Sequence, residues 1–497
     1  MKNPIVVALP HAWKTMSRMG CFLLSMLFLA WPAGAEEGIR IQAGASPALV
    51  NAAGETFTAK GVVYYQRHAA HHFFLENLDL SRLAADLETL REIGFNTLFL
   101  DVSWGEVVAE TDPGRNHQPL RLHSDRLEKL RTLATVTHKA GFYLYLSPSC
   151  ASVPPQVPAH TYPAVKDASG REYDSFKGYY VFDWLHDPAV NAGLLSYLEI
   201  LGETMRPFNH VIGYSFSFEM MDLTMPWARR EQAVVNAWRR YLRERNPDVA
   251  YWKKRWNLPE KNISSMDDLP FPSHTWPLWE KYYAASKEKP VESSPIAWRD
   301  VYHWRMVSLM RDGKNGLSFR NLADAVRRGD PDGLVLWKPM DPWRYTWEMD
   351  CLKEFKAGEA PEEVQEILDA IYNPPGADIL LFGAYPKFLA DPARRAKELD
   401  FTEQTAIIQA MRGLSKLPIY CQEYGINHHQ WTFEQCATYL PNAIRAFKDL
   451  SLLGYNLWQS HDYHAKPIED LIQPNFGLIG LNDTPHPTVS VVREALR

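Results

Sequence analysis

Short apolar runs alternate with amphipathic stretches along most of the chain, and this alternation predicts the fold. The segment 80–93 carries Leu or Ile at every third or fourth position, which is the spacing of one face of a helix. Gly94 follows, and the apolar run 95–102 then has the length and composition of a buried strand. The same order of helix, break and strand recurs about every 45 to 70 residues, which indicates a parallel α/β architecture.

Eight such units account for nearly all of the chain that follows its N-terminal segment. We expect strands at 58–65, 95–102, 142–146, 211–219, 334–338, 378–385, 419–423 and 454–459. Helices are expected between them, among others at 80–93, 127–140, 188–205, 402–414 and 437–452, the last with Pro441 in its first turn. Eight strand–helix units are what a (β/α)8 barrel, or TIM barrel, requires. An open doubly wound sheet is the competing architecture, but the chain contains no glycine-rich phosphate loop.

Two segments lie outside this regular repeat. In 36–58, the stretch Asn51–Gly54 separates two short extended runs and predicts a β-hairpin. The segment 227–294, after the fourth strand, is rich in Trp and charge and is expected to form helices with irregular connections. Because it has no long apolar periodic run of its own, we expect a lid or cleft wall within the barrel unit 59–497.

The N-terminus has the pattern of an export signal. Lys2, Lys14 and Arg18 precede an apolar run at 21–31, and an A-x-A site ends at Ala35. The run is too short to span a bilayer comfortably, although an uncleaved anchor is the alternative. We therefore expect 1–35 to be a signal peptide, the mature chain to be secreted or periplasmic, and no stable membrane insertion after cleavage.

Composition and the cysteines bear on the partners and the compartment of the chain. The formal net charge of −6 and the short longest basic run, 253–255, argue against a nucleic-acid partner. An aromatic content of 12%, with 17 Trp, is typical of sugar-binding clefts and also of large cores. Export implies an oxidising compartment, where the four mature cysteines allow three pairings or free buried thiols. These four residues are Cys150, Cys351, Cys421 and Cys436.

Two of the predicted strands end on a carboxylate. The run 211–219 ends at Glu219, and 419–423 ends at Glu423, three strands further along the barrel. Active sites of such barrels lie at the C-terminal ends of the strands, and side chains alternate between the two faces of a strand. We therefore expect the two glutamates to face each other across the barrel mouth.

The stretch 417–425, an aliphatic strand ending in Glu-Tyr-Gly, resembles the strand-seven motif of the clan A glycoside hydrolases, of the family 5 or family 42 type. The resemblance extends over about residues 40 to 490 and implies a retaining β-glycosidase. It implies that Glu423 is the nucleophile, that Glu219 is the general acid/base, and that the Tyr385 hydroxyl contacts the nucleophile. It also implies that Trp458 forms a floor under the reacting sugar. The expected substrate contacts are Trp104, Tyr385, Trp458, Asn456, His68 and His428.

The sequence departs from the clan's pattern at two positions. Phe218 stands where the clan usually has the Asn that binds the sugar 2-hydroxyl, and the usual strand-two arginine falls near Phe99. The support for the nucleophile must then come from Gln422, Asn456 or the His-rich loop after the first strand. These departures also admit a catalytically inactive barrel that binds polysaccharide. The sugar, the linkage and endo versus exo action stay open.

Several single residues have alternative roles. Asp101 and Asp222 are alternative acids, and Trp104 is as compatible with the core as with substrate contact. His68, with His71 and His72, is expected in a solvated or substrate-lining loop and not at a metal, because no Asp or His partners at ligand spacing accompany it. His428 and His429 follow the nucleophile strand and are expected to line the cleft in preference to binding zinc. We expect an oligo- or polysaccharide substrate, and neither a cofactor nor a metal.

Overall fold

The computed structural model describes most of the chain that follows residue 37. The described residues are 38–44, 46–70, 74–149, 152–157, 160–161, 165–166, 172–173, 180–181, 188–217, 232–258, 263–270, 299–300, 303–314, 318–339, 361–386, 397–464 and 475–497. The expected signal peptide 1–35, much of the insertion 227–294, and Phe218 and Glu219 lie outside these residues.

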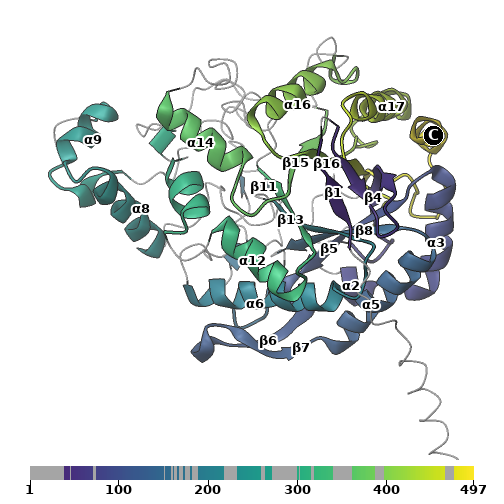
Figure 1. Cartoon of the computed structure of the whole chain (residues 1–497), viewed down its shortest axis with the longest axis horizontal. Helices are drawn as coiled ribbons and strands as arrows, with labels where there is room; N and C mark the ends of the chain where they lie inside the picture. Colours follow the sequence, from purple (N-terminus) through teal and green to yellow (C-terminus); the bar gives the residue numbers. More distant parts are fainter. Residues whose placement is uncertain are drawn as a thin grey trace, which may run out of the picture. The chain divides into compact units, whose positions relative to one another are not determined.

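Eight parallel strands close into a barrel in the order β13–β14–β15–β16–β17–β4–β5–β8 (Figure 1). Their bounds are β4 (Ala59–Val63), β5 (Thr97–Ser103), β8 (Tyr143–Ser149), β13 (Val211–Ser217), β14 (Leu334–Lys338), β15 (Ile379–Ala384), β16 (Ile419–Tyr424) and β17 (Gly454–Leu457). All eight strands overlap the runs predicted from the sequence. The predicted (β/α)8 fold is therefore confirmed.

Helices connect these strands and cover the barrel. Within the described residues they are α2 (Phe74–Asn77), α3 (Leu80–Ile93), α4 (Trp104–Val107), α5 (Ser124–Lys139), α6 (Pro188–Met205), α8 (Gln232–Arg245), α9 (Val249–Arg255), the π-helix η4 (His303–Arg311), α12 (Phe319–Gly329), α14 (Glu362–Tyr372), α16 (Thr402–Leu414), α17 (Phe433–Asp449) and α18 (Thr488–Leu496). Short 3-10 turns are η2 (Pro113–Arg115) and η3 (Met266–Asp268). None of the helices in this part of the chain is long and apolar enough to cross a membrane.

Local signals set the helix ends. The Asp79 side chain accepts the Ser81 N–H and begins α3, while Gly94, with φ of 112°, ends the helix in the left-handed region that favours glycine. Both bounds of α3 match the prediction. The predicted start of α17 was wrong, because Thr432 and Gln435 form a capping box and begin the helix at Phe433. Pro441 therefore lies inside the helix and not in its first turn.

Antiparallel strands accompany the barrel. The expected hairpin is present in a three-stranded sheet of β1 (Arg40–Gln42), β2 (Ala48–Val50) and β3 (Thr56–Phe57). Asn51 shapes its turn, because its side-chain oxygen accepts the N–H groups of Ala53 and Glu55. The sequence did not predict the β6–β7 hairpin (Val108–Asp112 and Gln118–Leu122). It also did not predict the short strands β9 (His160–Thr161), β10 (Val165–Lys166), β11 (Glu172–Tyr173) and β12 (Tyr180–Val181).

Large side chains fill the lower part of the barrel. Tyr420 of β16 stacks on Tyr145 of β8, with ring centroids 5.3 Å apart, although the two strands are far apart around the barrel. The contact therefore crosses the barrel interior. The Tyr420 hydroxyl donates to Asn456 Oδ1 over 2.8 Å. Gly61 of β4 makes room for this amide, because a Cβ at that position would lie 1.9 Å from Asn456 Oδ1.

Strand β13 alternates as predicted over its described length. The Tyr214 hydroxyl donates to Asp330 Oδ2, and Phe216 packs edge-on against Phe319 of α12, so both side chains face the helices. Ser215, between them, is fully buried on the opposite side, toward the interior.

Strand β16 does not alternate regularly. Its register shifts between Cys421 and Glu423 against β15, and again before Tyr424 against β17, so that Gln422 is an extra residue. Because of this bulge, Tyr420 and Glu423 both face the interior, although they are three residues apart. Tyr424 packs against Phe447 of α17 on the outside.

Candidate active site

Glu423 lies at the C-terminal end of β16, at the top of the packed interior. Its side chain is 14% exposed, and its carboxylate contacts Lys338, Tyr385 and Gln422, among others. Lys338 Nζ lies 3.3 Å from Oε2, and the Tyr385 hydroxyl donates to the same oxygen over 3.1 Å. The Gln422 side-chain amide donates to Oε1 over 3.1 Å. The contact expected for Tyr385 is therefore present, and Gln422 supplies part of the support that the sequence left open.

Lys338 is the residue of this site that sequence reasoning missed. It ends β14, two strands from β16, and its side chain is 2% exposed. A buried ammonium beside a carboxylate supplies the positive charge that Phe99, fully inside the barrel, cannot. The signal was available in the sequence, because Lys338 is a charged residue at the end of an apolar strand, as Glu423 is.

A second buried acid lies in the same interior. Asp101 of β5 is 2% exposed and accepts a hydrogen bond from the Tyr65 hydroxyl. Burial raises the pKa of Asp101 to about 7, with a further upward contribution from the Glu423 charge, while the hydrogen bond from Tyr65 acts in the opposite direction. The charge of the site therefore changes near neutral pH.

Three of the predicted substrate contacts, Trp458, Trp104 and Asn456, differ in where they lie and in how deeply they are buried. Trp458 is 8% exposed and meets Tyr65 edge-on, with ring centroids 5.6 Å apart. Trp104 is fully buried and lies parallel to Tyr197, which places it in the core. Asn456 is fully buried below Glu423, where its amide nitrogen donates to the Gln422 carbonyl and supports the bulge of β16. For these three residues, contact with substrate stays a prediction.

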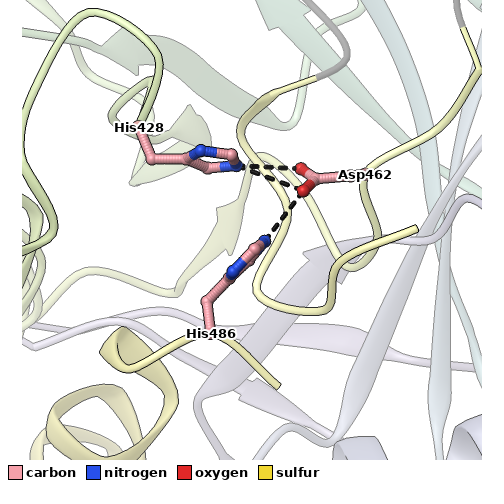
Figure 2. A group of neighbouring side chains, drawn as sticks. All are labelled: His428, Asp462 and His486. Carbon is pink, nitrogen blue, oxygen red and sulfur yellow. Dashed lines mark hydrogen bonds and ion pairs between the residues drawn. The ribbon is translucent and has the colours of Figure 1, made fainter. Parts of the chain in front are cut away.

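The two predicted histidines lie apart from the Glu423 carboxylate contacts. His68 is exposed and stacks on His464, with ring centroids 4.9 Å apart. His428 contacts Asp462, which a second histidine, His486, also contacts (Figure 2). Burial acts to raise the pKa of Asp462, but the hydrogen bonds from the two imidazoles outweigh it and hold this pKa below its ordinary value.

Several of the predicted residues cannot be placed. Glu219, Phe218, Asp222, Cys150 and Cys351 lie outside the described residues, and the description of β13 ends at Ser217. The two described cysteines, Cys421 and Cys436, are buried thiols and form no disulfide.

The barrel fold is one that glycoside hydrolases share. No protein-family model matches the chain, and no curated protein matches it in sequence. Solved structures do match it in fold.

An exo-β-1,4-mannosidase from Opitutaceae bacterium strain TAV5 is 17% identical with a TM-score of 0.52, and the match covers 92% of this chain and 62% of that one. A family 5 mannosidase from Rhizomucor miehei is 11% identical with a TM-score of 0.52, covering 93% and 98%. A β-galactosidase from Marinomonas ef1 is 15% identical with a TM-score of 0.53, covering 88% and 58%. At these identities the likeness establishes the shared fold, and the activities in those names are those of the named proteins.

Proposed function

We propose that the chain is an exported, retaining glycoside hydrolase that cleaves β-glycosidic bonds. The observation that carries the proposal is the Glu423 carboxylate at the C-terminal mouth of a closed barrel, bound by Lys338 and Tyr385. The glycoside hydrolases that share the fold support it. The N-terminal pattern of 1–35 supports the export.

In this mechanism Glu423 attacks the anomeric carbon. A nucleophilic carboxylate must be ionised, and the Lys338 charge and the Tyr385 O–H group both stabilise the ionised form. Both of these groups bind Oε2 and the Gln422 amide binds Oε1, so the two oxygens have different surroundings. The carboxylate is thus fixed in rotation before the sugar arrives.

The proton donor in the proposal is Glu219, two residues beyond the end of β13. In the first step the bond from the anomeric carbon to the leaving oxygen breaks, Glu219 protonates that oxygen, and a bond to Glu423 forms. In the second step water attacks the same carbon, its proton passes to Glu219, and Glu423 is released. This double displacement requires the two carboxyl groups to lie about 5–5.5 Å apart.

The experiment compares the wild type with Glu423→Ala and Glu219→Ala on aryl β-mannosides, β-galactosides and β-glucosides. The first two sugars are taken from the names of the similar structures. Glu423→Ala should form no glycosyl-enzyme. Glu219→Ala should accumulate one on activated substrates, and azide should rescue turnover to a β-glycosyl azide. General acid–base help sets the expected loss on natural glycans at about 10²–10⁴-fold.

The control is Glu434→Ala, which changes an exposed glutamate near the start of α17 and should behave as the wild type. Full activity of Glu423→Ala would remove the nucleophile assignment. A wild type that binds polysaccharide but hydrolyses none of the panel would establish the inactive, binding barrel instead.

A further inference from the structure

Three side chains converge in the loops that follow the last two barrel strands. His428 lies after β16, Asp462 after β17, and His486 two residues before α18. Figure 2 shows both imidazoles directed at the Asp462 carboxylate, with His428 Nε2 3.1 Å from Oδ1 and His486 Nε2 2.8 Å from Oδ2. The ligand atoms all lie within 4.8 Å of one another. We propose that these three residues bind one divalent transition-metal ion, with Zn²⁺ as the ion of choice.

The donor set selects this class of ion. Two imidazole nitrogens and one carboxylate oxygen suit zinc and its neighbours, whereas Ca²⁺ and Mg²⁺ take oxygen ligands. Bonds of about 2.0–2.2 Å in tetrahedral geometry place ligand atoms roughly 3.4 Å apart. The two His–Asp separations of 3.1 and 2.8 Å would open by about 0.3 and 0.6 Å, and all three ligand atoms already lie within 4.8 Å of one another.

Binding also has a simple proton balance. Each Nε2 atom must offer its lone pair to the ion, so a neutral imidazole carries its proton on Nδ1, and an imidazolium releases one proton to solvent. Three protein ligands leave one position of a tetrahedral ion for water.

The backbone holds the three ligands before any ion binds. The N–H of His428 donates to the Asn475 carbonyl, that of Asp462 to the Ile479 carbonyl, and that of His486 to the Leu478 carbonyl. One short segment, 475–479, therefore positions all three residues. This arrangement reduces the ordering that metal binding would otherwise require.

Gly477, within that segment, is matched to the carboxylate. Its N–H donates to Asp462 Oδ1 over 2.9 Å, and a Cβ on this residue would lie 2.7 Å from the same oxygen. Only glycine allows this approach, and a hydrogen bond of this kind orients a metal-binding carboxylate. The Phe433 ring covers the two imidazoles, with centroids 5.3 Å from His428 and 5.1 Å from His486. The imidazoles are still 16% and 20% exposed, so an ion can reach them.

The metal site would join two loops that each follow, in sequence, a residue of the candidate active site. His428 is five residues beyond Glu423, and Asp462 is four residues beyond Trp458. A metal here cross-links these loops to the start of α18, so we expect it to stabilise the fold without taking part in bond cleavage. The inference does not depend on the proposed hydrolase activity.

The test uses full-length mature protein without a polyhistidine tag, stripped with EDTA and titrated with Zn²⁺ by calorimetry. We expect one tight site per chain, visible Co²⁺ absorption bands that Zn²⁺ displaces, and a Tm that rises with Zn²⁺ concentration. His486→Gln is the informative variant, because its amide can still donate to Asp462 but binds zinc poorly. Its Zn²⁺ affinity should fall by more than about 100-fold, since outer-shell changes alone cost 10–100-fold.

His429→Gln is the matched control, because His429 is exposed and adjacent to His428. Like His486→Gln, it removes one histidine from the chain, and it should bind Zn²⁺ as the wild type does. Equal Zn²⁺ affinity of the wild type and His486→Gln would overturn the site, as would a wild type without a stoichiometric tight site. A Tm that does not respond to saturating Zn²⁺ would contradict the cross-linking role.

Discussion

Asp101→Asn should stabilise the protein in a pH-dependent way, because Asp101 is a buried acid whose pKa lies at about 7 against an ordinary value of 3.8. Between these two values the folded state binds more protons at this position than the unfolded state. The free energy of unfolding of the wild type therefore falls as pH rises through this window and levels off above it. Asparagine keeps an acceptor for the Tyr65 hydroxyl and does not ionise. The free energy of unfolding of the variant therefore does not fall with pH at this position.

The shift from 3.8 to about 7 corresponds to about 4 kcal/mol at 1.36 kcal/mol per pH unit. For a folded unit of roughly 460 residues, the entropy of unfolding near 60 °C is about 1 kcal/mol/K. The Tm advantage of Asp101→Asn over the wild type should therefore grow by about 4 °C between about pH 4 and about pH 8.

The assay is differential scanning calorimetry of both proteins at a fixed scan rate across this pH range. Tyr65→Phe is the matched check, because it removes the hydrogen bond that lowers the pKa of Asp101 and so should move the loss of stability to higher pH. A Tm difference between Asp101→Asn and the wild type that is the same at both ends of the pH range would refute the reasoning.

Three further changes test the site and the fold. Lys338→Met should lower kcat/KM by about 10²–10³-fold and move the acidic limb of its pH profile upward, because Glu423 loses a buried positive charge; an unchanged profile would contradict this. Tyr385→Phe removes one hydrogen bond to a charged oxygen and should cost about 10–100-fold in kcat/KM at unchanged Tm, measured on the same aryl glycoside. Thr432→Ala removes the capping box of α17 with Gln435 and should lower Tm by about 1 °C, since such caps contribute about 1 kcal/mol.

The sequence predicts the barrel well because its signals are local. The bounds of β14 and α16 match those expected, since an apolar run or a helical period ends at a break in each case. The error at α17 also has a local cause. Pro441 is a signal for a helix start, but Thr432 and Gln435 form a stronger one further upstream.

The candidate site is less predictable because it depends on register and on distant loops. Period-two alternation would place Tyr420 and Glu423 on opposite faces of β16, and only the extra residue Gln422 brings them to the same side. Lys338 is not predicted from the sequence, because the two strand-end carboxylates carry the prediction and a lysine is not one of them. No spacing rule connects His428 with His486, which meet only once the loops have folded.

The packed interior described above closes the barrel beneath the nucleophile. Among the described residues, Tyr145, Tyr420 and Asn456 fill the barrel beneath Glu423, so in the proposed reaction the sugar would meet the carboxylate from the C-terminal side of the strands. In the second step of that reaction, water attacks the face of the anomeric carbon that the departing group has left. An alcohol bound on that face competes with water for the carbon, so we expect the proposed reaction to transfer the sugar to acceptor sugars when these are concentrated.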